Sequence, residues 1–212
     1  MPATDLVLAV TGASGSMYAA RLLEVLLRSG RTVHLVMSPS AVEVAKEELE
    51  RSLRLEPEHF DVRALLGDAA NDLDLRRLRY HHFKDFRAGI ASGSFLTAGM
   101  VVCPCSMGTL AAIAQGHSEN LIHRAADVHL KERRKLVLVP RETPLGMVQL
   151  RNMLAVTEAG AVVLPAAPGF YHRPKALGDL VDFIVARICD QLGVEHPLSS
   201  RWGLPIQGEP RA

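Results

Sequence analysis

The sequence predicts an α/β fold in which helices cover both faces of a doubly wound, open parallel sheet. Three observations lead to this fold class. Short apolar runs alternate along the chain with longer segments of helical periodicity. The apolar runs are nearly continuous, which is typical of parallel strands that are buried on both sides. Turn-forming residues follow each run, and they form loops at the carboxyl edge of the sheet, where folds of this kind bind ligands.

Each element can be assigned in chain order. The expected strands are residues 6–10, 33–37, 100–103, 136–139 and 161–164. The expected helices are residues 18–28, 41–51, 109–114, 125–134, 145–158 and 177–192. The second helix has the clearest start, because Ser38 is a good N-cap and Pro39 suits the first helical position. The charge-dense stretch 53–86 is an excursion in which we expect one helix near residues 57–66 and one short strand.

The composition is that of one globular domain. The chain has 212 residues, of which 48% are hydrophobic and 22% are charged, so it can bury a large core. We expect a single domain over residues 1–195. Residues 196–212 contain Pro197, Pro205 and Pro210, so they are expected to form an extended tail that packs on the site or on a neighbouring subunit.

Charge and cysteine content exclude several classes of partner. Lys and Arg number 24 and Asp and Glu 23, so no general basic field exists for a nucleic acid or an anionic membrane. The start of the chain carries Asp5 and no basic segment, which argues against a signal peptide, and no apolar run is long enough to span a membrane. Three scattered cysteines, Cys103, Cys105 and Cys189, indicate a reducing cytoplasm, and they predict neither a disulfide framework nor a metal site.

A turn of small residues follows the first expected strand and opens a helix. In residues 11–16 the backbone N–H groups are expected to face an anion such as phosphate; a merely tight turn is the alternative. No Gly-Lys-Ser/Thr follows, so the turn is not a P-loop, and Met17 and Tyr18 stand where a dinucleotide fingerprint has its last glycine. Residues 37–40, after the second strand, contain no acidic residue to hold a ribose. A mononucleotide is therefore favoured over a dinucleotide.

Further polar groups are expected at the same edge. Residues 103–109 form a second turn of small residues, where a ligand can lie against the backbone. Arg141 follows the fourth strand, and a proline-rich loop after the fifth carries Tyr171. Other basic residues have structural roles as the alternative to ligand binding. Residues 131–135 can be ordinary surface charge, and Arg187 can form an ion pair with a nearby aspartate on a largely apolar helix face. The pattern suggests two anionic ligands, or one nucleotide and one small phosphate ester.

Several motifs occur in order along nearly the whole chain: Thr11-Gly12-Ala13-Ser14-Gly15, Ser92-Gly93-Ser94, Pro104-Cys105-Ser106, Arg124-Ala125-Ala126-Asp127 leading to residues 131–134, Val139-Pro140-Arg141-Glu142, and Phe170-Tyr171-His172-Arg173-Pro174. With these motifs the chain strongly resembles the flavin prenyltransferase family (UbiX type), within the flavin-containing cysteine decarboxylase superfamily. The resemblance implies a Rossmann-like flavoprotein that joins the prenyl group of dimethylallyl phosphate to N5 and C6 of reduced FMN. It also implies catalysis without metal, a homododecamer, and a product used by a separate decarboxylase.

The resemblance also implies roles for individual residues. The FMN-binding residues would be Gly12, Ala13, Ser14, Ser38, Ser106, Met107, Gly108, Thr109 and Arg141. The prenyl phosphate would be bound by Arg124, Lys131, Tyr171, Arg187 and Trp202. Ser14 and Glu48 would relay protons around the flavin, with Glu47 as the alternative glutamate, while Glu142 would be the general acid and Lys131 would act on the leaving phosphate. Phe86 stands where some members have tryptophan.

Two other functions compete with this interpretation. Residues 104–109 match the Pro-x-Ser-x-x-Thr pattern of FMN-dependent peptidyl-cysteine-type decarboxylases, but the second motif of that branch, Pro-x-Met-Asn, is absent from residues 140–143. A non-catalytic flavin-binding regulatory subunit would not need a group of side chains that binds the prenyl phosphate. The chain retains Lys131, Glu142 and Tyr171, which argues against such a subunit.

The side chains expected to bind the prenyl phosphate come from segments that one sheet edge cannot easily bring together. We therefore expect a site shared between subunits of a symmetric oligomer.

Overall fold

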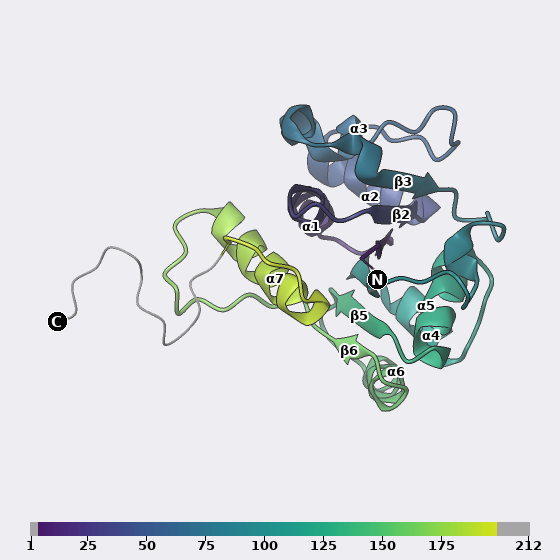
Figure 1. Ribbon diagram of the computed structural model, residues 1–212. Helices are drawn as coiled ribbons and strands as arrows, with labels where there is room; N and C mark the ends of the chain where they lie inside the picture. The colour runs from purple at the N-terminus through teal and green to yellow at the C-terminus, as the bar shows by residue number, and fades with distance from the viewer. Residues whose placement is uncertain (1–3, 199–212) are drawn as a thin grey trace.

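Six parallel strands form the central sheet of the computed structural model, which describes residues 4–198 (Figure 1). The strand order is β3-β2-β1-β4-β5-β6. The strands are β1 (Leu6–Val10), β2 (Val33–Met37), β3 (Leu78–His81), β4 (Gly99–Cys105), β5 (Lys135–Pro140) and β6 (Val162–Val163). The order reverses between β1 and β4, and a doubly wound sheet binds its ligand at that point. The predicted fold class is confirmed.

Helices cover both faces of this sheet and enclose two separate cores. One face is covered by α1 (Ser16–Arg28), α2 (Pro39–Leu49), α3 (Arg63–Leu66) and α7 (Leu177–Leu192), and the other by α4 (Met107–Ala114), α5 (Leu121–Lys131) and α6 (Met147–Glu158) (Figure 1). In β1, Leu6 and Leu8 pack into the first core, whereas Val7 and Ala9 pack into the second. Apolar side chains on both faces explain why the strands are continuous apolar runs. None of the described helices is both long and apolar enough to cross a bilayer.

Most element bounds agree with the sequence-based expectation to within two residues, and those of β1, β2 and α7 agree fully. The Ser38 cap is confirmed, because its Oγ accepts a hydrogen bond from the Ala41 N–H at 3.2 Å. The prediction for α5 was wrong by four residues at its start. Asn120 caps this helix by accepting a hydrogen bond from the His123 N–H at 3.0 Å, so α5 begins at residue 121. It ends at residue 131, and Arg133 has a left-handed φ of 56°.

The excursion between α2 and β4 contains less helix than its sequence suggests. The helix expected near residues 57–66 is reduced to α3, which is followed by 3₁₀ turns at Gly67–Asp72 and Leu75–Arg77. The expected short strand is β3 at the edge of the sheet. Its Tyr80 stacks on Phe60, with ring centroids 3.6 Å apart, and donates from its hydroxyl to the Leu55 carbonyl at 2.7 Å. These contacts fix the excursion to the sheet.

Gly12 allows the β1–α1 turn to lie against the start of α2. A Cβ at this position would overlap the Cβ of Ser40 and lie 3.2 Å from its carbonyl carbon. We expect Gly12→Ala to lower the free energy of unfolding by about 1–3 kcal/mol, because α2 must move away. The control is Gly178→Ala, at a helical position where an added Cβ meets no heavy atom within 4 Å. Urea unfolding checks this, and equal midpoints for the two variants would contradict it.

Candidate active site

A cavity of about 450 Å³ lies at the carboxyl edge of the sheet. It is lined by Ser14, Gly15, Met17, Tyr18, Glu48, Leu49, Arg141 and Ala166. The loops after β1, β5 and β6 and the last turn of α2 therefore meet here. The sequence placed Ser14 and Arg141 at one edge, and both line this cavity.

The carboxylate of Glu48 fills the N-terminus of α1. It accepts hydrogen bonds from the Gly15 N–H at 3.0 Å and from the Ser16 N–H at 2.7 Å. Gly15 has a φ of 120° and no side chain with which to cap the helix, so Glu48 supplies the missing acceptor. Burial works to raise the pKa of Glu48, but hydrogen bonds from Ser14, Ser16 and Gly15 outweigh it, so the pKa lies below the ordinary 4.5.

The first small-residue turn was expected to face the phosphate of a ligand, but the anion that it faces is the carboxylate of Glu48. The N–H groups of Gly15 and Ser16 are engaged by Glu48, and the contact identifies Glu48, not Glu47, as the glutamate at this turn. A ligand anion at this edge would find two other helix starts, those of α2 and α4, together with Arg141. Helix N-termini attract anions through their exposed N–H groups and dipole.

The start of α4 is tied to the first turn through Thr11. The Thr11 hydroxyl donates to the Pro104 carbonyl at 2.9 Å and accepts from the Ser106 N–H at 2.8 Å. Ser106 caps α4, because its Oγ accepts from the Thr109 N–H at 3.3 Å, and its hydroxyl also contacts the Thr109 hydroxyl at 3.1 Å. The two small-residue turns predicted to bind a ligand are therefore held side by side.

Arg141 brings a buried donor to this edge. Its Nε is buried and has no hydrogen-bond acceptor among residues 4–198. A buried donor without an acceptor costs about 1–3 kcal/mol, and an anionic or carbonyl oxygen of a ligand would remove this cost. Glu142, the next residue, is exposed at the same edge and accepts from the Thr143 N–H at 3.1 Å.

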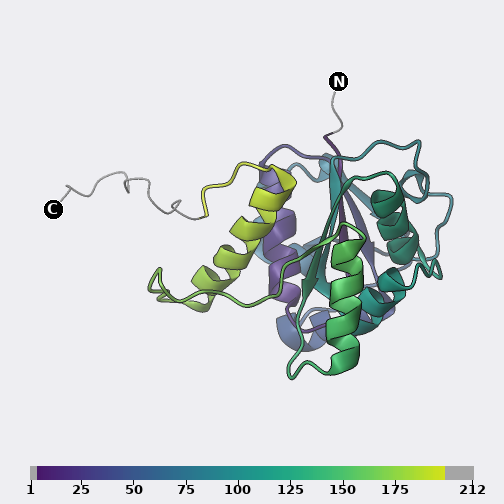
Figure 2. The ribbon, with the colours of Figure 1, turned by 90° about the horizontal axis from the view of Figure 1, so that it is seen from below.

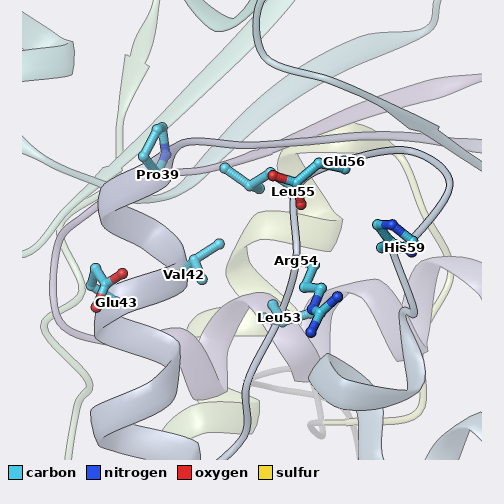
Figure 3. Close-up of a pocket in the computed structure, with 8 residues that line it drawn as sticks. All are labelled: Pro39, Val42, Glu43, Leu53, Arg54, Leu55, Glu56 and His59. Carbon is cyan, nitrogen blue, oxygen red and sulfur yellow. The ribbon is translucent and has the colours of Figure 1, made fainter.

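A second groove of about 480 Å³ lies beside α2 but lacks these features (Figure 3). Pro39, Val42 and Glu43 of α2 form one side, and the segment from Leu53 to His59 forms the other. Its charged side chains are of both signs, with Arg54 near Glu56 along the same segment. The carboxyl-edge cavity is therefore the better candidate site.

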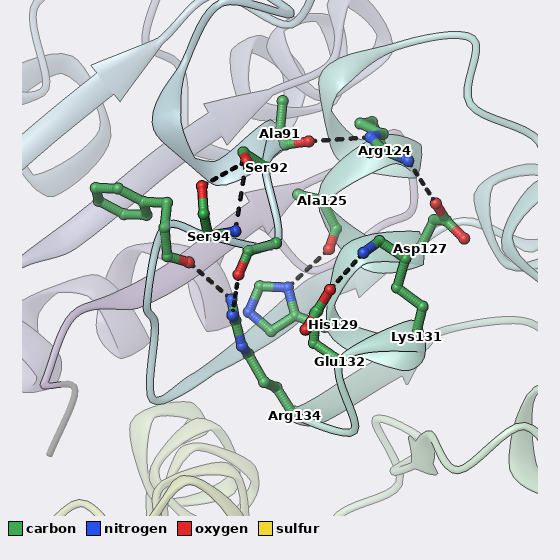
Figure 4. Close-up of polar contacts among 12 residues, drawn as sticks. Ala91, Ser92, Ser94, Arg124, Ala125, Asp127, His129, Lys131, Glu132 and Arg134 are labelled. Atoms are coloured by element: carbon green, nitrogen blue, oxygen red, sulfur yellow. Dashed lines mark hydrogen bonds and ion pairs between the residues drawn. The ribbon is translucent and has the colours of Figure 1, made fainter.

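Arg124 and Lys131 lie on α5, beside the loop that joins β3 to β4 (Figure 4). Arg124 donates from Nε to the Ala91 carbonyl at 3.0 Å and pairs with Asp127 at 2.8 Å. Lys131 forms an ion pair with Glu132. Because α5 ends four residues before β5 begins, Lys131 lies at the amino edge of the sheet, opposite the cavity.

Arg187 lies on α7, and Tyr171 lies in the loop before it. The loop before this helix projects with it from the body of the molecule (Figure 2), and Tyr171 is 68% exposed. The Tyr171 ring packs edge-on against Phe183, with ring centroids 5.7 Å apart, and Arg187 lies one helical turn after Phe183. Arg187 is exposed and pairs with Asp190 at 3.1 Å. The ion pair expected for Arg187 with a nearby aspartate is therefore confirmed. Arg187 was expected within the apolar face of α7, but it lies outside the buried face of this helix.

Known proteins of one family are similar to this chain over most of its length. The Flavoprotein family model matches residues 1–189. The chain is 50% identical over 194 residues to the flavin prenyltransferase UbiX of Alkalihalophilus pseudofirmus, covering 92% of this chain and 94% of the relative. The chain belongs to the flavin prenyltransferase family.

Solved structures of this family superpose on most of the chain. The crystal structure of AnUbiX (PadA1) in complex with FMN and dimethylallyl pyrophosphate has a TM-score of 0.83 and 42% identity, covering 96% of this chain and 100% of that one. The dodecameric FMN-dependent UbiX-like decarboxylase of Escherichia coli O157:H7 has a TM-score of 0.80 and 42% identity, covering 93% and 98%.

The site residues expected from the flavin prenyltransferase family thus form three groups in one chain. Arg124 and Lys131 belong to α5, Arg187 to α7 and Tyr171 to the loop before α7. The largest group lies at the carboxyl edge and consists of Gly12, Ala13, Ser14, Ser38, Glu48, Ser106, Met107, Gly108, Thr109, Arg141 and Glu142. Trp202 lies outside the described residues. Sequence reasoning missed the ion-pair partners Asp127 and Glu132; their spacing from Arg124 and Lys131 was the available signal.

The depressed pKa of Glu48 predicts a pH-dependent stability. A carboxyl group with a lowered pKa in the folded state stabilises the fold fully above its ordinary value of 4.5, and this contribution is lost as the pH falls through the folded-state pKa. We expect Glu48→Gln to be less stable than the wild type at neutral pH, with the difference shrinking below 4.5. Urea midpoints across this range measure it. Glu47→Gln is the control, and a similar pH profile in both variants would contradict the assignment.

Proposed function

We propose that this chain transfers the dimethylallyl group of dimethylallyl phosphate to N5 and C6 of reduced FMN, giving prenylated FMN. Family membership supports the reaction class, and the relative that contains FMN and dimethylallyl pyrophosphate supports the substrates. The observation in this chain that carries the proposal is the carboxyl-edge cavity. There the anionic Glu48 and the unsatisfied Arg141 donor lie beside the two small-residue turns.

The carboxyl edge fits an FMN molecule chemically. The starts of α2 and α4 and the Arg141 guanidinium offer donors to phosphate and to carbonyl oxygens. Ser38, Ser106 and Thr109 add hydroxyl groups at the same edge. Reduced FMN supplies the nucleophilic nitrogen and carbon atoms that attack the prenyl group.

The chain's own residues then have distinct tasks. The carbon–oxygen bond of the donor would break as its carbon bonds to N5, which loses a proton, and negative charge would develop on the departing phosphate. The prenyl double bond would then take up a proton as its other carbon bonds to C6, which loses its hydrogen as a proton. Lys131, Arg124, Tyr171 and Arg187 bind that phosphate, and Glu142 donates a proton to it. Glu48 is already a carboxylate, so with Ser14 it accepts the proton that leaves the flavin.

The active site is completed by further copies of the chain. Within one chain, Lys131 lies at the opposite sheet edge from Arg141, so a second copy must bring a lysine to the cavity. An apolar surface also needs a partner: Leu145, Met147, Val148, Leu150 and Leu154 are all exposed on or beside α6. The dodecameric relative supports a closed homo-oligomer, for which we propose twelve subunits. Light scattering tests this, and an active monomer would reject it.

The decisive experiment incubates the purified protein with reduced FMN and dimethylallyl phosphate without oxygen, followed by mass spectrometry of the flavin. We expect a flavin that has gained one dimethylallyl group in place of one hydrogen atom. An unmodified flavin would favour the cysteine-decarboxylase or the non-catalytic alternative. Adding the product to a decarboxylase that lacks its cofactor tests whether prenylated FMN is handed to such a partner.

A further inference from the structure

Lys131 lies on a platform formed by residues that the proposed reaction does not use. The platform consists of Gly93, in the loop between β3 and β4, together with Glu132 and Arg134. Figure 4 shows Glu132 at the end of α5 and Arg134 just before β5. Lys131 and Glu132 form an ion pair that lies over Gly93. A lysine on a flexible four-carbon stem would otherwise sample many rotamers at an exposed position.

Gly93 forms the surface on which the Lys131–Glu132 ion pair lies, and we call it the floor of the platform. A Cβ at this position would overlap the Glu132 carboxylate and lie 3.0 Å from Lys131 Nζ. A side chain at residue 93 would therefore displace both members of the ion pair. The space available at Gly93 sets where the ammonium group can lie.

Arg134 fixes the floor to the protein. Its guanidinium donates to the Gly93 carbonyl and, at 2.7 Å, to the Phe95 carbonyl (Figure 4). The floor is thus tied to the residue that leads directly into β5. Two charge-assisted hydrogen bonds from one planar group give this short loop a defined position.

His129 holds the last turn of α5 against the same loop. It is 1% exposed, and burial lowers the pKa of its imidazole to about 4, so the ring is neutral. Nδ1 lies 2.7 Å from the Ala125 carbonyl, which can only accept, so Nδ1 donates. Nε2 then accepts from the Thr97 hydroxyl at 2.8 Å. Both ends of the platform, helix and loop, are therefore fixed by buried or charge-assisted bonds.

We propose that Gly93, Glu132 and Arg134 are positioning residues that hold the Lys131 ammonium where it meets the phosphate of the prenyl donor. This inference rests on the proposed function, because it assigns the phosphate to Lys131. Glu132 orients the ammonium, which retains further N–H donors for the phosphate oxygens. The direction in which Glu132 changes the affinity for phosphate distinguishes two possible roles. A carboxylate that merely competed with phosphate would weaken binding, whereas an orienting carboxylate strengthens it.

The test compares Gly93→Ala and Glu132→Ala with the wild type, using the assembled protein with FMN bound. We expect the KM for dimethylallyl phosphate to rise about tenfold in each, as for a lost charge-assisted hydrogen bond, with kcat at saturating donor nearly unchanged. Gly178→Ala is the control for adding a methyl group. Glu132→Gln, which keeps an acceptor, should restore part of the affinity. A lower KM in Glu132→Ala would overturn the proposal.

The same substitutions in a Lys131→Ala background separate positioning from a general structural role. If Gly93 and Glu132 act through Lys131, neither substitution should raise the KM further there. Equal effects in both backgrounds would overturn the proposal.

Calorimetry with inorganic phosphate on the FMN-bound protein gives a readout that does not depend on turnover. If no prenylated flavin forms but phosphate affinity falls in the same pattern, the proposed function fails and the positioning role stands. If phosphate affinity is unchanged, the positioning role fails.

Discussion

Glu142→Gln should leave FMN binding intact and slow prenyl transfer by about 10²- to 10⁴-fold, the loss typical of removing a general acid. The amide keeps the size of the side chain and much of its hydrogen bonding, but it has no proton to transfer. Glu142 is exposed beside Arg141 at the carboxyl edge, so the substitution disturbs no buried contact.

Single-turnover formation of prenylated flavin at saturating donor measures this effect without contributions from product release. Glu158→Gln, at the exposed end of α6, is the matched control and should react at the wild-type rate. If Glu142→Gln also reacts at that rate, the leaving phosphate takes its proton from solvent or departs without one.

Lys131→Ala should lower kcat/KM for dimethylallyl phosphate by about 10²- to 10³-fold, because the charge that develops on the phosphate loses its ammonium partner. Tyr171→Phe should cost less, about 1.5–3 kcal/mol, because it removes one hydrogen bond to a charged group. Steady-state kinetics with varied donor check the ranking, and Lys135→Ala, at the exposed first residue of β5, is the control. A smaller loss in Lys131→Ala than in Tyr171→Phe would contradict the assignment.

The fold could be predicted because its signals are local. The apolar runs of β1 and β2 end at turn formers, and α7 is followed by Gly193, whose φ of 63° suits glycine. β3 was expected only as an unplaced short strand, because it is a four-residue edge strand whose side chains are partly exposed. Its place in the sheet depends on distant contacts such as Tyr80 with Leu55.

The sequence predicts the position of a site residue where that residue directly follows a strand. Ser14 and Arg141 follow strands, so parallel topology brings them to one edge. The contact of Glu48 with Gly15 joins residues 33 positions apart, and no local sequence pattern predicts it. The position of Lys131 at the opposite edge follows from the direction of α5, which only the assembled fold reveals.

The strand order also determines how the chain folds during synthesis. β1, β2 and β3 lie within the first 81 residues and can pair as soon as these have left the ribosome. β1 is then an unpaired edge, because its other neighbour, β4, starts only at Gly99. Until β4 emerges, this edge of β1 can pair with another chain. Val7 and Ala9 face water for longer, until α4 and α5 cover them. A nascent-chain chaperone would therefore be needed most between the emergence of His81 and that of Cys105 from the ribosome.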